Sequence, residues 1–333
     1  MDVRDTDRPV RWGILATGGI AHSFAADLAL VDDAEIVAVG SRRLQSAAAF
    51  AAEHGGRPHG SYAELLADTD VDVVYVATPH GRHVEDVRAC FAAGKHVLCE
   101  KALTLAAASA QALVDEARTA GLFFCEAMWL RTNPRIRAVV DAVRAGAVGE
   151  VRQVRADLGF VAPYDPASRV WDPALGASAL LDVGIYPLTF TWLVLGPPQA
   201  VVAAGTLSDR GIDVSGGATL TYASGAVATI SWTQTSWSDN RAAVSGADGR
   251  IELAPRMHQP PSWSLAQGWE VVEHAEEVIG RGYAHEILEV GGCLRAGLLE
   301  SPLIPLDETV AILATMDTMR EQMGVRGPVR LGP

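Results

Sequence analysis

Residues 10–21 read VRWGILATGGIA, a short apolar strand that runs into a glycine-containing turn. The turn is a variant of G-x-G-x-x-G/A, the pattern in which small residues let the backbone approach a dinucleotide pyrophosphate. Ala16 stands in the place of the first glycine, Gly18 would face the pyrophosphate, and Ala21 is small enough for close helix–strand packing. The alternative is an ordinary tight turn between a strand and a helix, since a single imperfect fingerprint is weak evidence.

A second apolar strand, residues 36–39, favours the dinucleotide interpretation and indicates which cofactor binds. Its end is followed by Ser41, Arg42 and Arg43, about 20 residues after the glycines, where NAD-specific folds place an acid for the ribose 2′-hydroxyl. Arginine suits a 2′-phosphate instead, so the sequence favours NADP over NAD. The alternative is an exposed arginine pair at the start of a helix. The residues predicted to contact the cofactor here are Ala16, Thr17, Gly18, Gly19, Ile20, Ser41, Arg42 and Arg43.

Strands and helices continue to alternate through the first half of the chain. Apolar strands are expected at residues 71–77, 97–99 and 122–125, with helices at 83–93 and 105–120. Such alternation predicts a parallel sheet covered on both faces, and hence a doubly wound Rossmann fold. A capping box at residues 61–64 predicts a short helix, and Asn133 followed by Pro134 predicts the start of another.

An acid–lysine pair stands where one of these strands ends. Residues 92–101 read AAGKHVLCEK: a helix ends at Gly94, a short strand follows, and Glu100 and Lys101 close the run. Ligands of open parallel sheets bind beyond the carboxyl ends of the strands. Lys101 is therefore expected beside the cofactor.

The second half has a different pattern, dominated by alternating strands. Residues 151–156 and 218–222 form two of them, and a hairpin at Ser224-Gly225 leads into residues 226–234. Along the last strand, Ala228, Ile230 and Trp232 share one face, while Val227, Thr229, Ser231 and Thr233 share the other. This predicts an α+β domain with an open sheet that is packed on one face. We therefore expect an α/β protein with a Rossmann domain at residues 1–127 and a substrate and oligomerisation domain at residues 128–333.

Taken together, these motifs resemble the glucose–fructose oxidoreductase / inositol dehydrogenase (Gfo/Idh/MocA) family over nearly the whole chain. The resemblance rests on the glycine-rich turn, on Ala77-Thr78-Pro79 followed by His83, on residues 94–101, and on LLDVGIY at residues 180–186. Residues 125–131, CEAMWLR, and the final Tyr186 resemble more narrowly the dimeric dihydrodiol dehydrogenase / NADP-dependent D-xylose dehydrogenase branch.

The chain departs from the family pattern at two positions. The usual Glu-Lys-Pro is Glu100-Lys101-Ala102 here, and alanine is expected to tolerate the same backbone. The inositol-type branch has histidine where this chain has Tyr186, which argues against inositol-like polyols.

The resemblance implies an oxidoreductase that acts on a CH–OH group, with a large, mainly antiparallel sheet used for subunit contact. Tyr186 would transfer the proton, and Lys101 and Asp182 would orient the substrate. Asp182 and Tyr186 are four residues apart, so a helical segment would place both on one face, although Gly184 and Pro187 predict a kink there. A cation near Tyr186 would lower the pKa of its phenol. The resemblance also places Thr78, Pro79, His83, Glu100 and Lys101 at the cofactor.

Three further residues are candidates for the substrate pocket, and no residue cluster points to a metal. Trp129 and Arg131 follow a strand end, and Arg169 lies in the loop before Asp182. Trp129 is almost as well explained as a core residue. His80 and His83 alone do not supply a metal-ligand cluster, so no metal is expected.

Composition limits the partners of the chain. Of its 333 residues, 40 are Asp or Glu and 27 are Lys or Arg, without a basic cluster, which argues against nucleic acid. No apolar run approaches the ~18 residues that a membrane span needs. The N-terminal residues are charged and the four cysteines lie far apart, both of which favour a reduced, cytoplasmic protein.

The sequence therefore predicts an NADP-dependent dehydrogenase or reductase of a sugar, polyol or cyclic trans-diol, assembled as a homodimer or larger oligomer through its C-terminal sheet. A non-catalytic NADP-binding regulator or sensor on the same fold is the alternative. The set Lys101, Asp182 and Tyr186 favours the enzyme, because a sensor has no need of proton-transfer groups.

Overall fold

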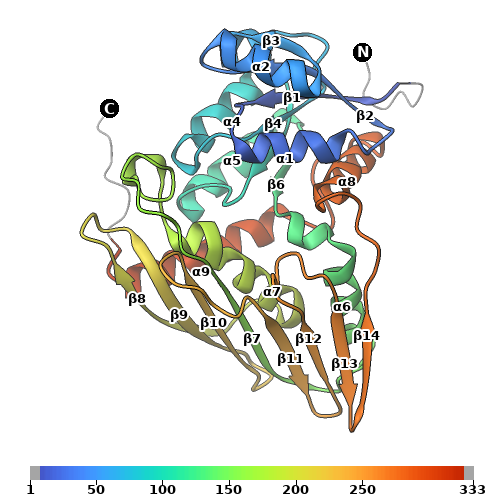
Figure 1. Cartoon of the computed structure of the whole chain (residues 1–333), viewed down its shortest axis with the longest axis vertical. Helices are drawn as coiled ribbons and strands as arrows, with labels where there is room; N and C mark the ends of the chain where they lie inside the picture. Colours follow the sequence, from blue (N-terminus) through green and yellow to red (C-terminus); the bar gives the residue numbers. More distant parts are fainter. Residues whose placement is uncertain (1–7, 326–333) are drawn as a thin grey trace. The chain divides into compact units, whose positions relative to one another are not determined.

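The computed structural model describes residues 8–325 and divides into two compact units (Figure 1). Unit 1 comprises Met1–Thr104, Ala108–Thr132 and Val278–Val310, and unit 2 comprises Leu105–Ala107, Asn133–Glu277 and Ala311–Pro333. These units differ from two continuous domains that meet at residue 127, because the chain returns to unit 1 after residue 277. The charged N-terminal residues that favoured a cytoplasmic location lie outside the described residues.

Among the described residues, unit 1 contains a six-stranded sheet in the order β3-β2-β1-β4-β5-β6. All neighbouring strands are parallel, which is the doubly wound order with its switch point between β1 and β4. The predicted Rossmann fold is confirmed. The strands are β1 (Val10–Leu15), β2 (Ala34–Gly40), β3 (Arg57–His59), β4 (Val73–Val76), β5 (His96–Glu100) and β6 (Phe124–Ala127).

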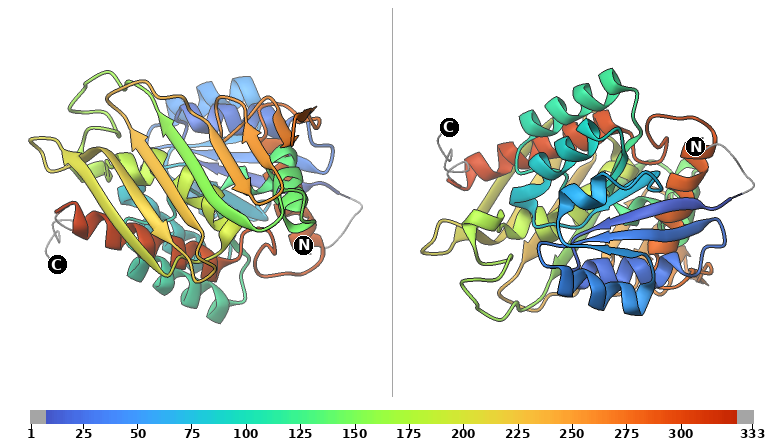
Figure 2. Two further views of the ribbon diagram at one scale, coloured as in Figure 1. Left: turned by 90° about the horizontal axis from the view of Figure 1, so that it is seen from below. Right: turned by 90° about the horizontal axis from the view of Figure 1, so that it is seen from above.

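Helices lie on both sides of this sheet, with α1 and α2 on one side and α4 and α5 on the other (Figure 2). Ser61 accepts a hydrogen bond from the Glu64 amide and so caps α3, as its capping box predicts. The core is aromatic: the ring of Phe24 stacks on Tyr75 at 3.7 Å and meets the edge of Trp12 at 5.4 Å. The helices of unit 1 are α1 (Gly19–Leu28), α2 (Leu44–His54), α3 (Tyr62–Leu66), α4 (His83–Ala92), α5 (Ala107–Ala120) and α8 (Tyr283–Arg295), with 3-10 turns at His80–Arg82 and Trp129–Thr132.

Unit 2 contains, within the described residues, an eight-stranded sheet in the order β14-β13-β12-β11-β7-β10-β9-β8. Only β7 and β10 pair in parallel, so the expected large, mainly antiparallel sheet is confirmed. The predicted hairpin at Ser224-Gly225 joins β9 to β10. The strands are β7 (Val151–Gly159), β8 (Ala200–Leu207), β9 (Asp213–Thr221), β10 (Val227–Thr233), β11 (Ala242–Gly246), β12 (Arg250–Leu253), β13 (Trp263–Gln267) and β14 (Glu270–His274).

Strand register shows which face of this sheet is the core. One row of paired residues crosses five strands and is buried throughout: Leu220, Ala228, Val154, Val244 and Ile251. The neighbouring row, which contains Thr219 and Thr229, is exposed in β9 and β10. Helices cover one face, and the opposite face is free of helices in the view from below (Figure 2). The helices here are α6 (Pro134–Arg144), α7 (Ile185–Leu195) and α9 (Leu306–Gln322), which begins in unit 1.

Two further expectations concern the chemistry of the core. All four cysteines are buried and unpaired, which confirms their prediction as small hydrophobic residues. The segment Pro173–Leu195, in contrast, is long and apolar enough by composition to cross a membrane, so the expectation that no segment approaches that length is wrong. Because 83% of its most apolar window is buried within the structure, this segment has the character of a core helix.

Candidate functional site

The turn after β1 leaves an anion-binding helix end open. Ala16 has a φ of +85°, a left-handed conformation that usually favours glycine, and its amide donates to the Gly40 carbonyl at 3.0 Å. Gly18 caps α1 without any side-chain hydrogen bond, and a Cβ at Gly18 or Gly19 would meet nothing within 4 Å. The start of α1 is therefore uncrowded and has no side-chain cap, which leaves room for a phosphate at this helix end.

The three residues after β2 lie next to this turn in the sheet order. Ser41 is buried, and its amide donates to His59 at 3.2 Å. Arg42 and Arg43 are exposed, and within residues 8–325 neither guanidinium forms an ion pair. Two unpaired guanidinium groups beside a dinucleotide-type turn fit a phosphate ligand.

The end of β4 is fixed by a buried histidine. His83 lies with Nε2 2.8 Å from the Thr78 carbonyl oxygen and Nδ1 3.1 Å from that of Ala102. Burial lowers its pKa. Both ring nitrogens face backbone carbonyls, so His83 ties the end of β4 to the loop after β5 and is not exposed to a cofactor. Thr78, in contrast, has a buried hydroxyl without a partner among the described residues, which suits a ligand contact.

Lys101 stands in the loop that follows β5. His80 lies with Nε2 3.0 Å from the Lys101 carbonyl oxygen, and the peptide bond between Lys101 and Ala102 is cis. Its neighbour Glu100 is buried and accepts a short hydrogen bond from the Tyr75 hydroxyl. Burial raises the pKa of Tyr75, so the phenol is the donor. Lys101 directly follows the carboxyl end of β5, which is the predicted position at the end of a strand.

Glu126 is a functional candidate that the sequence reasoning missed. It lies in β6 and accepts hydrogen bonds from the Leu103 amide at 2.9 Å and the Thr309 hydroxyl at 3.2 Å. Burial raises its pKa to about 7, and the nearby cations Arg131 and Lys101 oppose that rise. A carboxyl that titrates near neutrality beneath the lysine loop is typical of functional sites. The only sequence signal was its place in the CEAMWLR motif.

Two proposed substrate residues have structural partners instead. Arg131 is buried and forms a short ion pair with Glu308 of α9, so its charge is balanced by a carboxylate of unit 1. Trp129 is buried, and its ring packs on Tyr283 at 4.7 Å. The surroundings of Trp129 are thus those of a core residue, which was the alternative to a place in the substrate pocket. Neither partner is near in sequence, so the strand-end position alone could not reveal these contacts, and the substrate role of both residues stays a prediction.

In unit 2, the motif LLDVGIY forms a π-helical turn, Leu180–Gly184, that runs directly into α7. The buried carboxylate of Asp213 accepts from the Leu180 amide at 2.7 Å and so fixes the start of this turn. Gly184 is required by close approach, because a Cβ there would lie 2.9 Å from the indole of Trp232. The predicted irregularity is thus confirmed, and π-helical turns are frequent at functional sites.

The π-helical turn holds Asp182 and leads to Tyr186, the second residue of α7. Asp182 is nearly buried, and its carboxylate accepts a hydrogen bond from Arg169 at 3.0 Å. The ring of Tyr186, also nearly buried, lies 5.2 Å from the ring of His258. The structure therefore pairs Arg169, which was predicted as a substrate residue, with Asp182, and it adds His258, which no sequence pattern had indicated.

The predicted residues thus form two groups. Unit 1 holds the cofactor set and Lys101, and unit 2 holds Asp182, Tyr186 and Arg169. Each group is described within its own unit, and the joint action of Lys101 with Tyr186 stays a prediction.

The fold and the open turn of unit 1 define a dinucleotide-binding enzyme. A family described as "Oxidoreductase family, NAD-binding Rossmann fold" matches residues 10–127, and the GFO/IDH/MocA C-terminal domain matches residues 136–252. The chain belongs to the Gfo/Idh/MocA family of oxidoreductases.

Full-length relatives agree with this assignment. The chain is 34% identical to trans-1,2-dihydrobenzene-1,2-diol dehydrogenase of Bos taurus over 336 residues, covering 96% of this chain and 98% of that protein. The Homo sapiens enzyme of the same name is also 34% identical, with the same coverage. A 3-ketoreductase from Actinomadura kijaniata, solved with NADP and TDP-benzene, superposes with a TM-score of 0.86 at 27% identity, covering 95% of this chain and 98% of that one.

Proposed function

We propose that the chain is an NADP-dependent oxidoreductase that transfers a hydride between nicotinamide and a CH–OH or carbonyl group of a sugar, a polyol or a cyclic trans-diol. The observation that carries the proposal is the segment from Asp182 to Tyr186, where a nearly buried carboxylate and phenol stand on one π-helical to α-helical turn. A protein that only binds a cofactor has no need of such a pair. The names of the relatives supply the substrate class.

The residues of unit 1 fit a phosphorylated dinucleotide. The open amides at Gly18 and Gly19 would hold the pyrophosphate, and Arg42 and Arg43 would hold the 2′-phosphate through charge-assisted hydrogen bonds. The unpartnered hydroxyl of Thr78 offers a further contact at the end of β4. The exposed arginines and the absence of an acid at residues 41–43 favour NADP over NAD.

The proposed reaction transfers a hydride and a proton through different groups. Bound between the helix end at Gly18 and the arginines at residues 42 and 43, the nicotinamide cofactor would supply hydride transfer to or from the carbinol carbon of the substrate. Tyr186 takes the hydroxyl proton in oxidation and gives it back in reduction. Lys101 supplies a positive charge that stabilises the phenolate form, and Asp182, oriented by Arg169, positions the substrate hydroxyl groups. His83 and Glu126 act as positioning residues for the Lys101 loop.

We also propose a dimer or larger oligomer that forms through the helix-free face of the unit 2 sheet. Stable interfaces bury on the order of 1,200–2,000 Å², which a face of this kind can supply. Its outward residues Thr219, Thr229 and Val202 are exposed and lie in one row across three strands. Four buried, unpaired cysteines support a reducing compartment, so we place the enzyme in the cytoplasm.

The catalytic proposal is tested by removing one oxygen atom. Tyr186→Phe keeps the ring and its packing, and loss of a positioned acid–base group typically costs ~100–10,000-fold in turnover. We therefore expect turnover to fall at least ~100-fold while NADP affinity changes only a few-fold. The matched control is Tyr222→Phe, which removes the hydroxyl of another buried tyrosine of unit 2; that hydroxyl has no partner among the described residues. The control is expected to retain wild-type turnover.

Lys101→Met extends the test to unit 1, since it keeps the length of the stem and removes the charge. If Lys101 and Tyr186 act as one unit, the double variant is expected to be little slower than either single variant. Near-normal turnover of Tyr186→Phe would transfer the proton-transfer role to another group and contradict the proposal. Fully additive losses would contradict the joint action of the two residues.

A further inference from the structure

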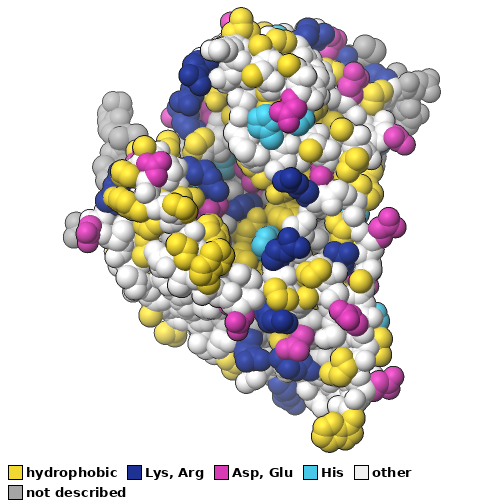
Figure 3. Space-filling model, viewed as in Figure 1, with side chains coloured by type: hydrophobic (Ala, Val, Ile, Leu, Met, Phe, Trp, Pro, Cys, Tyr) yellow, Lys and Arg dark blue, Asp and Glu magenta, His cyan; other side chains and the backbone are white. Residues whose placement is uncertain are grey.

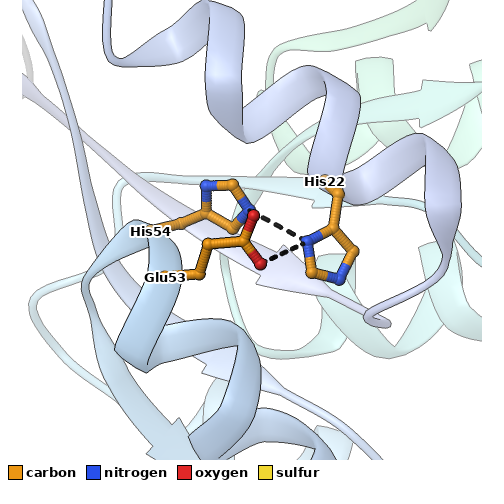
Figure 4. A group of neighbouring side chains, drawn as sticks. All are labelled: His22, Glu53 and His54. Atoms are coloured by element: carbon orange, nitrogen blue, oxygen red, sulfur yellow. Dashed lines mark hydrogen bonds and ion pairs between the residues drawn. The ribbon is translucent and has the colours of Figure 1, made fainter.

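Two histidines and a glutamate meet on the surface of unit 1, away from the residues assigned to catalysis. His22 lies on α1, and Glu53 and His54 are the last two residues of α2 (Figure 4). The two imidazole rings turn one nitrogen each toward the other, and the carboxylate reaches the same point. None of these residues belongs to the motifs that carry the family resemblance.

The spacing of the donor atoms matches the edges of a metal coordination polyhedron. His22 Nδ1 lies 2.9 Å from His54 Nε2, and the Glu53 carboxylate lies 3.2 Å from the first nitrogen and 3.4 Å from the second. Zinc ligands at about 2.0–2.1 Å in tetrahedral geometry stand about 3.3–3.4 Å from one another. The three donors therefore need to move by only a few tenths of an ångström to share one ion.

The surroundings hold the rings in place and leave one side open. Phe50, one turn before His54 on α2, packs against both imidazoles, with ring centroids 4.6 Å from His22 and 4.7 Å from His54. The His54 side chain is 11% exposed, whereas His22 is 40% and Glu53 is 61% exposed. Histidine and acidic surface lie side by side over the α1–α2 region in Figure 3. Water can thus complete the coordination.

We propose that His22, Glu53 and His54 form a binding site for a divalent transition-metal ion of the zinc type, with two nitrogen donors, one carboxylate and an open position. Imidazole with carboxylate suits Zn²⁺ and its neighbours, whereas Mg²⁺ and Ca²⁺ prefer oxygen ligands alone. Binding requires His22 to carry its proton on Nε2 and His54 on Nδ1, so that both facing lone pairs point to the ion. The ion would clamp α1 to α2, the two helices that follow the predicted phosphate contacts.

Without metal, the same contact is a hydrogen bond in which one imidazole donates to the other. Metal binding therefore has to be measured directly. Apo-protein freed of metal with a chelator is titrated with Zn²⁺ by calorimetry, and separately with Mg²⁺. We expect one equivalent of Zn²⁺ to bind and Mg²⁺ to give no saturable heat. His22→Gln and His54→Gln should each weaken Zn²⁺ binding at least about tenfold, since even partners outside the ligand shell are worth about 10–100-fold.

The matched control is His59→Gln. His59 is another histidine of unit 1, and its Nε2 lies 3.2 Å from the Asp68 carboxylate, but its described contacts include no second imidazole. It should leave Zn²⁺ affinity unchanged. Saturating Zn²⁺ should also raise the melting temperature of the wild type by about 5 °C and leave that of His22→Gln unchanged. His22 is half exposed, so its variant is expected to fold even where His54→Gln does not. Absence of Zn²⁺ binding, or a Zn²⁺ affinity that His22→Gln leaves intact, would overturn the proposal.

Discussion

Glu126 predicts how the stability of this protein responds to pH. Its carboxyl is buried in β6 beneath the Lys101 loop, and burial raises its pKa from 4.5 to about 7. Each pKa unit is worth about 1.4 kcal/mol, so this change corresponds to about 3 kcal/mol. Below about pH 4.5 the carboxyl is protonated in folded and unfolded chains alike. Between 4.5 and about 7 the folded chain keeps a proton that the unfolded chain releases, so stability falls as the pH rises.

Glu126→Gln removes this titration and preserves the local hydrogen bonds. The amide oxygen can still accept from the Leu103 amide, and the amide nitrogen can donate to the Thr309 hydroxyl. We expect the variant and the wild type to have similar free energies of unfolding at about pH 5. At about pH 8 the variant should be more stable by about 3 kcal/mol, because the wild type must then bury a charge.

The measurement is a pair of urea-unfolding titrations at the two pH values for each protein. Glu116→Gln is the control, since Glu116 is an exposed glutamate of unit 1 that pairs with Arg88. The control should shift stability by less than about 0.5 kcal/mol at either pH. If the stability difference between Glu126→Gln and the wild type were the same at both pH values, the carboxyl would not titrate near neutrality. The inference that burial dominates its environment would then be refuted.

Two further predictions concern the cofactor and the assembly. Arg42→Ala should weaken NADP binding about 10–100-fold, since a charge-assisted hydrogen bond is worth roughly 1.5–3 kcal/mol, and it should leave NAD binding within about twofold. Fluorescence titration of both cofactors measures these affinities, with Arg88→Ala as the control. Equal losses for NAD and NADP would contradict a 2′-phosphate contact. Val202→Glu changes a residue of β8 that is 72% exposed, and it should convert the oligomer to a monomer in sedimentation at micromolar concentration because it places a charge in the interface. The control Leu30→Glu, at an exposed leucine of unit 1, should leave the oligomer intact. A wild type that sediments as a monomer would refute the interface.

Local sequence patterns predicted most of the elements in the first 144 residues because the causes of these elements are local. The alternation of apolar runs predicted the six parallel strands in all but β3, and Asn133, whose side chain accepts from the Arg135 amide, starts α6 as expected. Gly184 and Pro187 predicted a kink in this segment, where the structure has a π-helical turn before α7; close approach to Trp232 explains why residue 184 is glycine.

The roles of individual side chains depended on partners distant in the chain. Arg131 pairs with Glu308, 177 residues away, so a position after a strand end could not reveal that its charge is already neutralised. Glu126 meets Thr309, and α8 packs on α1, which is why unit 1 includes residues that follow unit 2 in sequence. His22 and His54 are likewise 32 residues apart and meet only because α1 and α2 lie on the same side of the sheet.

The proposed function requires that this chain oxidise or reduce a sugar, polyol or cyclic trans-diol with NADP. The most direct measurement follows the absorbance of reduced nicotinamide while purified protein meets a panel of aldoses, inositols and trans-diols, first with NADP and then with NAD. We predict turnover of at least one aldose or trans-diol, faster with NADP than with NAD at equal, subsaturating cofactor concentration. NADP binding without turnover of any compound, in either direction, would contradict an enzymatic role.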